Sequence, residues 1–273
     1  MDAQTYRERP PARVLARHVS SVWVQRVPKG APPYEHRTVP HGSIEVAVEL
    51  GSLPRVVGPQ TRPLVETLAS GATVVGLRFH PGAAPPVLRI PASELVDLSV
   101  DWWDRSAAAL GEKMAAAPSP EHAAVLLERA MLDLVADADG LDPVVTETVR
   151  ALLPWGTTDV ATLPDALHIS ERQLRRRTAA AIGLAPKVVQ RMLRFQGFLA
   201  LAHARPHASL ALLAADTGYA DQPHLTRESL RLAALTPRVL LDEAAENCIG
   251  LHDHSASRLP LLRTRALRKP AGR

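Results

Sequence analysis

The sequence predicts an α+β protein, with a β-rich N-terminal domain and an all-α C-terminal domain in which a helix joins two helix-turn-helix units. Three observations support this fold class: segments rich in Val and Ile early in the chain, helical periodicity from about residue 119, and two matching patterns of helix, turn and helix after residue 158. The 273 residues suffice for two domains of ordinary size, and the 46% of hydrophobic residues suffice for packed cores.

The N-terminal part of the chain is predicted to form short strands at 19–27, 43–50 and 73–79. These segments partly alternate apolar with polar residues, and turns containing Gly and Pro separate them. This pattern is typical of a small, mostly antiparallel sheet or barrel. We therefore assign residues 1–118 to a β-rich domain.

Helical periodicity begins after this domain. Ser119 and Pro120 are a typical helix cap and first helical residue, and apolar residues between Leu126 and Leu134 fall on one face of the predicted helix. We assign residues 119–141 to a connecting helix. Its apolar face either packs on the sheet or forms a dimer interface.

The C-terminal domain is predicted at residues 142–246. It contains a first unit (159–182) and a second unit (209–232), each made of a short helix, a tight turn and a second helix. Ser170 and Asp221 precede the second helices, where their side chains can accept hydrogen bonds from free backbone N–H groups. In each unit, leucines of the two helices point toward a shared core. These leucines are Leu163 and Leu174 in the first unit, and Leu213 and Leu225 in the second.

Positive charge is concentrated in the second half of the chain. Residues 1–150 contain 15 Lys+Arg and 18 Asp+Glu, whereas residues 151–273 contain 17 and 10. The net charges of −3 and +7 are typical of a protein whose C-terminal part binds a polyanion. The aromatic content of 4% argues against a single-strand binder built on base stacking. The basic tail, residues 247–273, is predicted to be disordered.

The sequence also bears on the compartment. It has no apolar run of the roughly 20 residues that a membrane span needs, and its N-terminus lacks the apolar stretch of a signal peptide. The single cysteine, Cys248, allows no internal disulfide, which fits a reducing environment. We therefore expect a cytoplasmic protein.

Polar side chains lie on the outward face of each unit's second helix, opposite the leucines. Arg can bind guanine with two hydrogen bonds, Gln can do the same for adenine, and Arg or Thr can bind phosphate. A solvated charged face explains either cluster alone, but two matching units favour helices that enter the major groove of duplex DNA. The predicted DNA-binding residues are Arg172, Arg175 and Arg176, with Arg177 as a further candidate, in the first unit, and Gln222, His224, Thr226 and Arg227 in the second.

Over roughly residues 142–241, the sequence resembles the AraC/XylS family of transcriptional regulators. The resemblance rests on ISERQLRRR, GLAPKVVQRMLRFQ and ADTGYADQPHLTRESLRLAALTP. The N-terminal half has a weaker resemblance to a poorly characterised sensory domain. The family resemblance implies a bacterial transcription factor that regulates transcription initiation and is modulated through its N-terminal domain. It also implies RNA polymerase as a partner, a possible small-molecule effector and a possible homodimer. By position, it implies base contacts by the residues named above other than Arg177 and, ranked last, by Pro223.

The chain departs from the family pattern at several positions. The family has Phe where this chain has Thr178 and Ser229, and we expect Leu230 and Leu232 to compensate in the second unit only. His168 replaces the glycine of the first turn, and Ala234 replaces the glycine before Leu-Thr-Pro. Pro164 lies within the first unit's leading helix, which we expect to be kinked or to begin late with Thr162 as its cap. We therefore predict that the first unit folds but is the less stable one.

An alternative function is a metal-dependent, cupin-like enzyme with an appended helical domain. His36, His41, Glu45 and His80 would be its candidate ligands, but the four-residue separation of His36 and His41 differs from cupin spacing. Surface or turn histidines explain these residues better. We therefore predict no metal, no other cofactor, no catalytic residue and no enzyme activity.

A further interpretation of the N-terminal domain is a sensor of small molecules or a dimerisation module. Aromatic residues could line an apolar pocket there, although in a strand-rich domain they more often form plain core. The candidates are Trp23, Tyr34, Phe79, Trp102 and Trp103.

Overall fold

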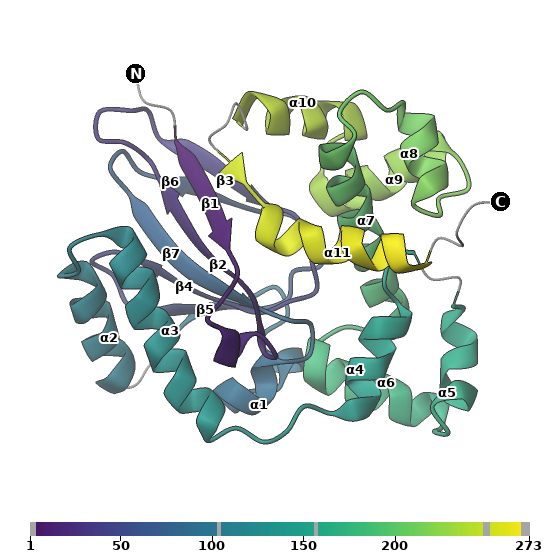
Figure 1. Ribbon diagram of the computed structural model, residues 1–273, viewed down its shortest axis with the longest axis horizontal. Coiled ribbons are helices and arrows are strands. Elements are labelled where there is room, and N and C mark those ends of the chain that lie inside the picture. The colour runs from purple at the N-terminus through teal and green to yellow at the C-terminus, as the bar shows by residue number, and fades with distance from the viewer. Residues whose placement is uncertain (1–3, 103–104, 156–157, 248–251, 269–273) are drawn as a thin grey trace.

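The computed structural model of the protein describes residues 4–102, 105–155, 158–247 and 252–268. A β-sheet with helices packed on it forms one half of the molecule, and a group of helices forms the other (Figure 1). The first part of the chain supplies the sheet, and the green helices of the second part lie beside it. The predicted α+β class is therefore confirmed.

Seven strands form the main sheet in the order β8-β5-β4-β7-β2-β1-β9. Neighbouring strands are antiparallel, except that β9 is parallel to β1. The predicted strands at 19–27, 43–50 and 73–79 correspond to β2, β4 and β7, which are adjacent at its centre. The strands are β1 (Thr5–Arg9), β2 (Val19–Arg26), β4 (Glu45–Glu49), β5 (Arg55–Val57), β7 (Thr73–Phe79), β8 (Ser99–Asp101) and β9 (His252–Asp253).

Helices cover one face of this sheet. The connecting helix exists as α3 (Pro120–Ala136), and Ser119 caps it by accepting a hydrogen bond from the backbone N–H of His122. Leu127 and Met131 of α3 are buried against the sheet, so the apolar face of α3 packs on the sheet rather than forming a dimer interface. The other elements of this part are α1 (Ala84–Leu88), α2 (Arg105–Ala115) and the short 3-10 helices η1 (Arg13–Leu15) and η2 (Ala92–Glu94).

The opposite face of the sheet lies partly against a second, two-stranded sheet. Strands β3 (Tyr34–Thr38) and β6 (Leu64–Leu68) pair antiparallel to form it. Side chains alternate along a strand, so β2 directs Val22 toward the helices. It directs Trp23 and Gln25 to the opposite face, toward β3 and β6.

The C-terminal half contains the predicted helices. Its core includes the four leucines predicted to face inward, Leu163, Leu174, Leu213 and Leu225, all at most 2% exposed. The helices are α4 (Pro143–Ala151), η3 (Val160–Thr162), α5 (Leu163–Ala166), α6 (Glu171–Ile182), α7 (Pro186–Ala204), α8 (Leu210–Asp216), α9 (Gln222–Ala233) and α10 (Pro237–Asn247).

The prediction of a disordered tail at 247–273 is wrong for residues 252–268. Strand β9 adds to the free edge of β1, and α11 (Ser255–Arg268) packs against α7, β1 and β2 (Figure 1). Ala256 is buried, and the indole N–H of Trp155 donates to the carbonyl oxygen of Leu261 over 2.6 Å. An open strand edge and apolar surface thus order a segment whose composition is basic. Cys248 lies outside the described residues.

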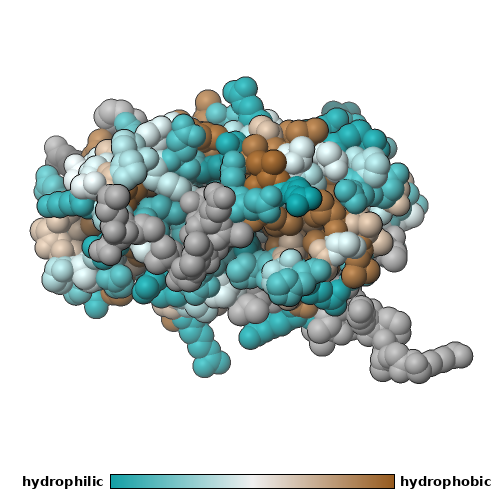
Figure 2. All heavy atoms as spheres, turned by 90° about the horizontal axis from the view of Figure 1, so that it is seen from above, coloured by the Kyte–Doolittle hydropathy of each residue, from teal (hydrophilic) through white to brown (hydrophobic). Residues whose placement is uncertain are grey.

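Within the described parts of the chain, no helix combines the length and the apolar character that crossing a membrane requires. The face seen from above in Figure 2 is largely hydrophilic, with hydrophobic side chains gathered to the right of its centre. Some large hydrophobic side chains of the helical half are exposed, among them Leu212, Leu230 and Val239.

Candidate nucleic-acid interface

The leading helix of the first unit is short. Residues Val160–Thr162 form the 3-10 helix η3, and α5 covers only Leu163–Ala166, with Pro164 in its first turn. In the first turn a proline interrupts no helical hydrogen bond, because the backbone N–H groups there have no partner within the helix. Of the two expectations, a kinked helix or a late start, the structure shows the late start. Thr162 occupies the N-cap position as predicted, but its side chain makes no capping hydrogen bond, because the hydroxyl donates instead to the carbonyl oxygen of Asp159.

The recognition helix of the first unit, α6, begins with a complete capping box. The Ser170 hydroxyl accepts from the backbone N–H of Gln173 over 3.2 Å, and the Gln173 side chain accepts from the backbone N–H of Ser170 over 3.0 Å. His168, in the turn before it, adopts a left-handed backbone with φ of 53°. These local interactions fix where α6 starts and which side chains it directs outward.

Three arginines lie on the outward face of α6. Arg172, Arg175 and Arg176 are all exposed, and Arg175 has a weak contact with Glu171 at 3.9 Å. Arg177 differs from them, because its guanidinium lies 3.1 Å from the carboxylate of Asp142, the residue that caps α4. The further candidate Arg177 thus joins α6 to α4, and the three predicted arginines remain available to a ligand.

The second unit has longer leading and turn segments. Helix α8 covers seven residues, Gly218 adopts a left-handed φ of 76°, and Asp221 caps α9 through the backbone N–H of His224. The ring of Tyr219 is buried in the turn, with the Arg194 guanidinium 5.7 Å from its centre. This contact joins the turn to α7.

The outward face of α9 is more mixed than that of α6. Gln222 and Arg227 are exposed, whereas His224 and Thr226 are half-buried. The His224 ring meets Tyr219 edge to face, and the Thr226 hydroxyl donates to the carbonyl oxygen of Gln222 over 3.0 Å. All four predicted residues therefore lie on the part of α9 that is not buried, but two of them already have local partners.

Helix α7 holds the two units together. Its Phe195 and Phe198 are fully buried with ring centres 5.5 Å apart, and its Arg191 pairs with Glu228 of α9 at 2.9 Å. A Cβ added to Gly197 would lie only 2.5 Å from Pro154, so α7 also packs closely on the segment after α4. The separation of α6 and α9 is thus set by a buried helix.

The positions where the resemblance implies phenylalanine are filled by small polar residues. Thr178 and Ser229 are fully buried, and their hydroxyls donate to the carbonyl oxygens of Leu174 (2.8 Å) and Leu235 (2.7 Å). Leu232 is buried as expected, but Leu230 is 48% exposed, so the expectation that Leu230 compensates is wrong.

The N-terminal domain contacts both units. At the end of α6, a Cβ on Gly183 would lie 2.7 Å from the carbonyl oxygen of Ala92, which shows a close backbone approach. On the second unit, Arg37 donates to the carbonyl oxygen of Ala233, the last residue of α9, over 3.3 Å. Between them, Gln196 of α7 donates to the carbonyl oxygen of Pro40 over 3.0 Å.

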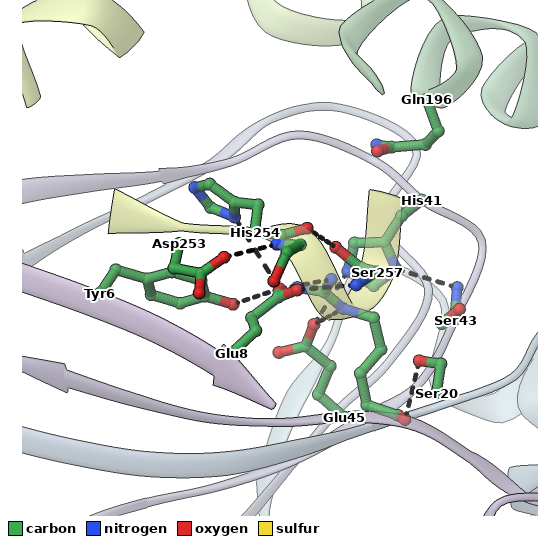
Figure 3. A network of polar contacts seen from close by, with 12 residues as sticks. Tyr6, Glu8, Ser20, His41, Ser43, Glu45, Gln196, Asp253, His254 and Ser257 are labelled. Carbon is green, nitrogen blue, oxygen red and sulfur yellow. Dashed lines mark hydrogen bonds and ion pairs between the residues drawn. The ribbon is translucent and has the colours of Figure 1, made fainter. Parts of the chain in front are cut away.

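A polar network continues from Pro40 into the N-terminal domain (Figure 3). His41 Nδ1 accepts from the backbone N–H of Ser43, so Nε2 carries the proton and faces the Glu45 carboxylate at 3.1 Å. Arg78 bridges the carboxylates of Glu45 and Glu8. Burial alone would raise the pKa of Glu45, but Arg78 and His41 lower it to about 2.

The same network reaches the C-terminal segment. Glu8 accepts from the Tyr6 hydroxyl (2.8 Å) and from the backbone N–H of Ser257 (3.0 Å) and lies 3.8 Å from the His254 ring. Burial opposes the charge on Glu8, yet His254 and Arg78 hold its pKa well below the usual value. Helix α11 is therefore joined to the sheet by a charged, buried group as well as by packing.

The structure divides the metal-ligand candidates. His41 and Glu45 are in contact and His36 lines the same pocket, but His80 lies elsewhere, with Nε2 3.3 Å from the carbonyl oxygen of Ala16. Among the described residues, no group of three or more His, Cys, Asp or Glu side chains could hold a metal ion. His41 lies in the turn between β3 and β4, as the expectation of surface or turn histidines has it, whereas that expectation is wrong for His36, a partly buried residue of strand β3.

The aromatic candidates do not form one pocket. Trp23 alone of them lines the pocket under β3 and β6. Phe79 is fully buried in the core between the sheet and the helices, Trp102 packs against that core, and Trp103 lies outside the described residues. Gln25, which also lines this pocket, was not among the residues predicted from the sequence, because its only signal is its alternation with Val22 and Val24 in β2.

Two family models match the chain. Residues 163–243 match a helix-turn-helix domain (HTH_18), and residues 7–101 match a domain of unknown function (DUF6597). No curated protein matches.

Several solved structures of ToxT from Vibrio cholerae are similar to this chain. ToxT bound to (E)-4-(8-methylnaphthalen-1-yl)but-3-enoic acid has a TM-score of 0.47 and 11% identity, with 87% of this chain and 98% of that chain covered. The apo form of a ToxT variant has 0.45 and 13%, with 81% and 96% covered, and ToxT bound to an unsaturated fatty acid has 0.42 and 10%, with 92% and 97% covered.

The family match at 163–243 begins at the start of α5 and ends within α10, so it includes nearly all of the first unit, the connecting helix, the second unit and the first part of α10. The chain therefore contains a helix-turn-helix domain at residues 163–243 behind a β-rich N-terminal domain, and this domain supports a DNA-binding transcription regulator.

Proposed function

We propose that this protein binds duplex DNA sequence-specifically, with α6 and α9 in successive major grooves, and thereby regulates transcription initiation. The observation that supports this most is the pair of capped recognition helices joined by one buried helix, each with predicted DNA-binding residues on its outward face. One helix fits the major groove, and successive grooves on one side of B-DNA are about 34 Å apart.

The side chains suggest which bases or phosphates each of the two helices contacts. Arg172, Arg175 and Arg176 suit guanine or phosphate, which favours guanine in one half of the site. Gln222 suits adenine, and Arg227 suits either guanine or phosphate. His224 and Thr226 would first give up local partners, so we expect smaller contributions from them.

We further propose that the N-terminal domain modulates DNA binding. It touches α6 through Gly183, α7 through Gln196 and the end of α9 through Ala233, so a shift of the domain would alter how the two recognition helices are placed. A small-molecule effector, RNA polymerase and a second copy of the chain are the partners that this role implies. The four candidate metal ligands are not assembled in one place, and we propose no enzyme activity.

The test is binding of the purified protein to fragments of its own upstream region, titrated with salt and with random competitor DNA. We expect binding that survives competitor and weakens steeply as salt rises, because phosphate contacts release counterions. Binding that competitor abolishes would contradict sequence specificity, and no binding at low salt would contradict the proposal as a whole.

A further inference from the structure

A pocket lies between the main sheet and the two-stranded sheet β3–β6, away from the predicted DNA-binding residues. Its cavity volume is about 40 Å³, and it is partly open to solvent. It therefore suits a small molecule of a few heavy atoms. Its lining includes Trp23 and Gln25 of β2, Glu45 and Ala47 of β4, His36 of β3 and Glu66 of β6.

Two buried donors in this lining lack a partner. The indole N–H of Trp23 and the amide NH₂ of Gln25 have no hydrogen bond to any described residue, although Trp23 is only 7% and Gln25 only 1% exposed. Leaving a buried donor unpaired costs about 1–3 kcal/mol, so such groups call for a physical explanation. Because the two residues are two positions apart on one strand, their side chains leave the same face of the sheet from Cα atoms roughly 7 Å apart.

Both unpaired groups in the pocket are donors. Two further polar side chains of the lining have partners: Gln60 donates to the carbonyl oxygen of Gly58, and both ring nitrogens of His41 have partners. What the Trp23 and Gln25 donors lack is a hydrogen-bond acceptor. Alcohols and amines bring donors as well, whereas a carbonyl oxygen brings acceptor capacity alone.

The charged groups of the lining are already paired. Glu45 lies against Arg78 and His41, and Arg55 lies 3.1 Å from Glu66. Burial lowers the pKa of His36 to about 4 and also lowers that of His41, so both rings are neutral at pH 7. A charged ligand would lose its hydration here without gaining a free counter-charge, which is costly.

Apolar side chains complete the walls, among them Ala47, Val57 and Val74. We propose that this pocket binds a small, uncharged carbonyl compound, whose oxygen accepts hydrogen bonds from Trp23 and Gln25 and whose carbon skeleton packs on the apolar walls. The role of this ligand rests on the proposed function, because the ligand would be the effector that the N-terminal domain senses.

The pocket is connected to the DNA-binding half through His41 and Pro40. The carbonyl oxygen of Pro40 accepts a hydrogen bond from Gln196 of α7.

The test uses cyclopentanone as the probe and the full-length, ¹⁵N-labelled protein. Titration is followed by NMR of the four Trp indole N–H signals, and Trp23→Phe assigns the relevant one. We expect a saturable downfield shift of the Trp23 signal, because a new hydrogen bond deshields its proton. The Trp155 indole, which already donates to Leu261, is an internal control that should not move.

Two variants locate the site. Ala47→Leu fills the pocket and should abolish the shift. Gln25→Leu keeps the size of the side chain but removes one donor, and should weaken binding roughly 2- to 10-fold, the usual worth of one hydrogen bond. An unchanged titration in either variant whose far-ultraviolet circular dichroism matches the wild type would overturn the assignment.

Two charged molecules of similar shape test the ligand class. Cyclopentanecarboxylate and cyclopentylammonium should bind at least 10-fold more weakly than cyclopentanone, and equal or tighter binding of either would overturn the proposal, as would no saturable shift with cyclopentanone.

Binding to upstream DNA is measured on the same protein. If Trp23 does not respond but specific DNA binding is present, the pocket inference alone fails. If Trp23 responds and DNA binding is absent, the proposed function alone fails.

Discussion

The two helix-turn-helix units share a layout but place glycine at different points. Each unit has one left-handed residue in its turn and another at the end of its recognition helix. The first unit has His168 in the turn and Gly183 at the helix end, whereas the second has Gly218 in the turn and Ala234 at the end. A left-handed conformation costs a residue with a Cβ roughly 1–2 kcal/mol, so each unit contains one strained position.

The surroundings explain the difference at the helix ends. Gly183 meets the backbone of Ala92 in the N-terminal domain, where a Cβ has no room, whereas Ala234 is exposed. The first unit is therefore packed on the N-terminal domain, and the second is held chiefly by α7, through Arg191 and Arg194. Matching units can thus depend on different parts of one molecule.

The largest effect is expected from Gly183→Ala. The new Cβ would add left-handed strain to a clash with the Ala92 carbonyl oxygen, for a loss of about 2–4 kcal/mol in the free energy of unfolding. Gly218→Ala is the matched control, because only Arg194, at 4.0 Å, lies near its Cβ; it should lose about 1–2 kcal/mol. Equal losses in urea denaturation would contradict the claim that the N-terminal domain packs closely on the first unit.

DNA affinity should respond next most strongly. Arg175→Ala or Arg176→Ala should weaken binding to upstream DNA by about 1–3 kcal/mol for a lost base contact. Arg238→Ala on α10 is the control, since its side chain is 85% exposed and lies outside the two recognition helices. Unchanged affinity in both α6 variants would remove the first unit from the interface.

Mild acid should loosen the first unit before the second. Burial lowers the pKa of His36 to about 4 in the folded protein. In the unfolded chain this ring takes up a proton already near pH 6.5, so the free energy of unfolding falls as the pH decreases from about 6.5 to 4. His36 faces Glu45, His254 and Arg78 in the N-terminal domain. Protection factors, which correct amide exchange for its intrinsic dependence on pH, should fall more in α6 than in α9 between pH 7 and pH 5. His36→Gln should reduce this difference, and an equal fall in wild-type α6 and α9 would count against domain support of the first unit.

At neutral pH, the leading helices should also differ. Helix α5 has four residues and α8 has seven, so α5 has fewer internal hydrogen bonds to protect its amides. We expect faster amide exchange in α5 than in α8, as the prediction of a less stable first unit requires. Slower exchange in α5 would overturn that prediction.

The smallest predicted effects are increases in stability. Ala234→Gly and His168→Gly each remove a left-handed residue with a Cβ, and each should raise the free energy of unfolding by about 0.5–1 kcal/mol after the entropy of the unfolded chain is counted. Thermal unfolding measures this, with Ala180→Gly on the exposed side of α6 as a control that should be destabilising. A loss of stability in either turn variant would show that its side chain makes a needed contact.

Sequence analysis succeeded where the signals are local. The caps Ser119, Ser170 and Asp221 and the inward leucines follow from chemistry within a few residues of the chain, and the structure confirms them. Pro164 was also interpretable, because the position of a proline within a helix limits where that helix can begin.

It failed where distant segments meet. The two residues of β9 pair with β1 almost 250 positions earlier, and no local pattern announces such a pairing. The pocket was missed for a similar reason: its roof is the pair β3 and β6, short segments beside Pro-rich turns, and only their folding over β2 places His36 and His41 beside Gln25. The DNA contacts themselves remain predictions.

A footprint on the upstream site tests the central claim most directly, that both recognition helices bind DNA. We predict two protected major-groove segments about one turn, or roughly 10 base pairs, apart, and loss of only one of them when Arg175 and Arg176 are both changed to alanine. A single protected segment that is unchanged in this double variant would contradict the account.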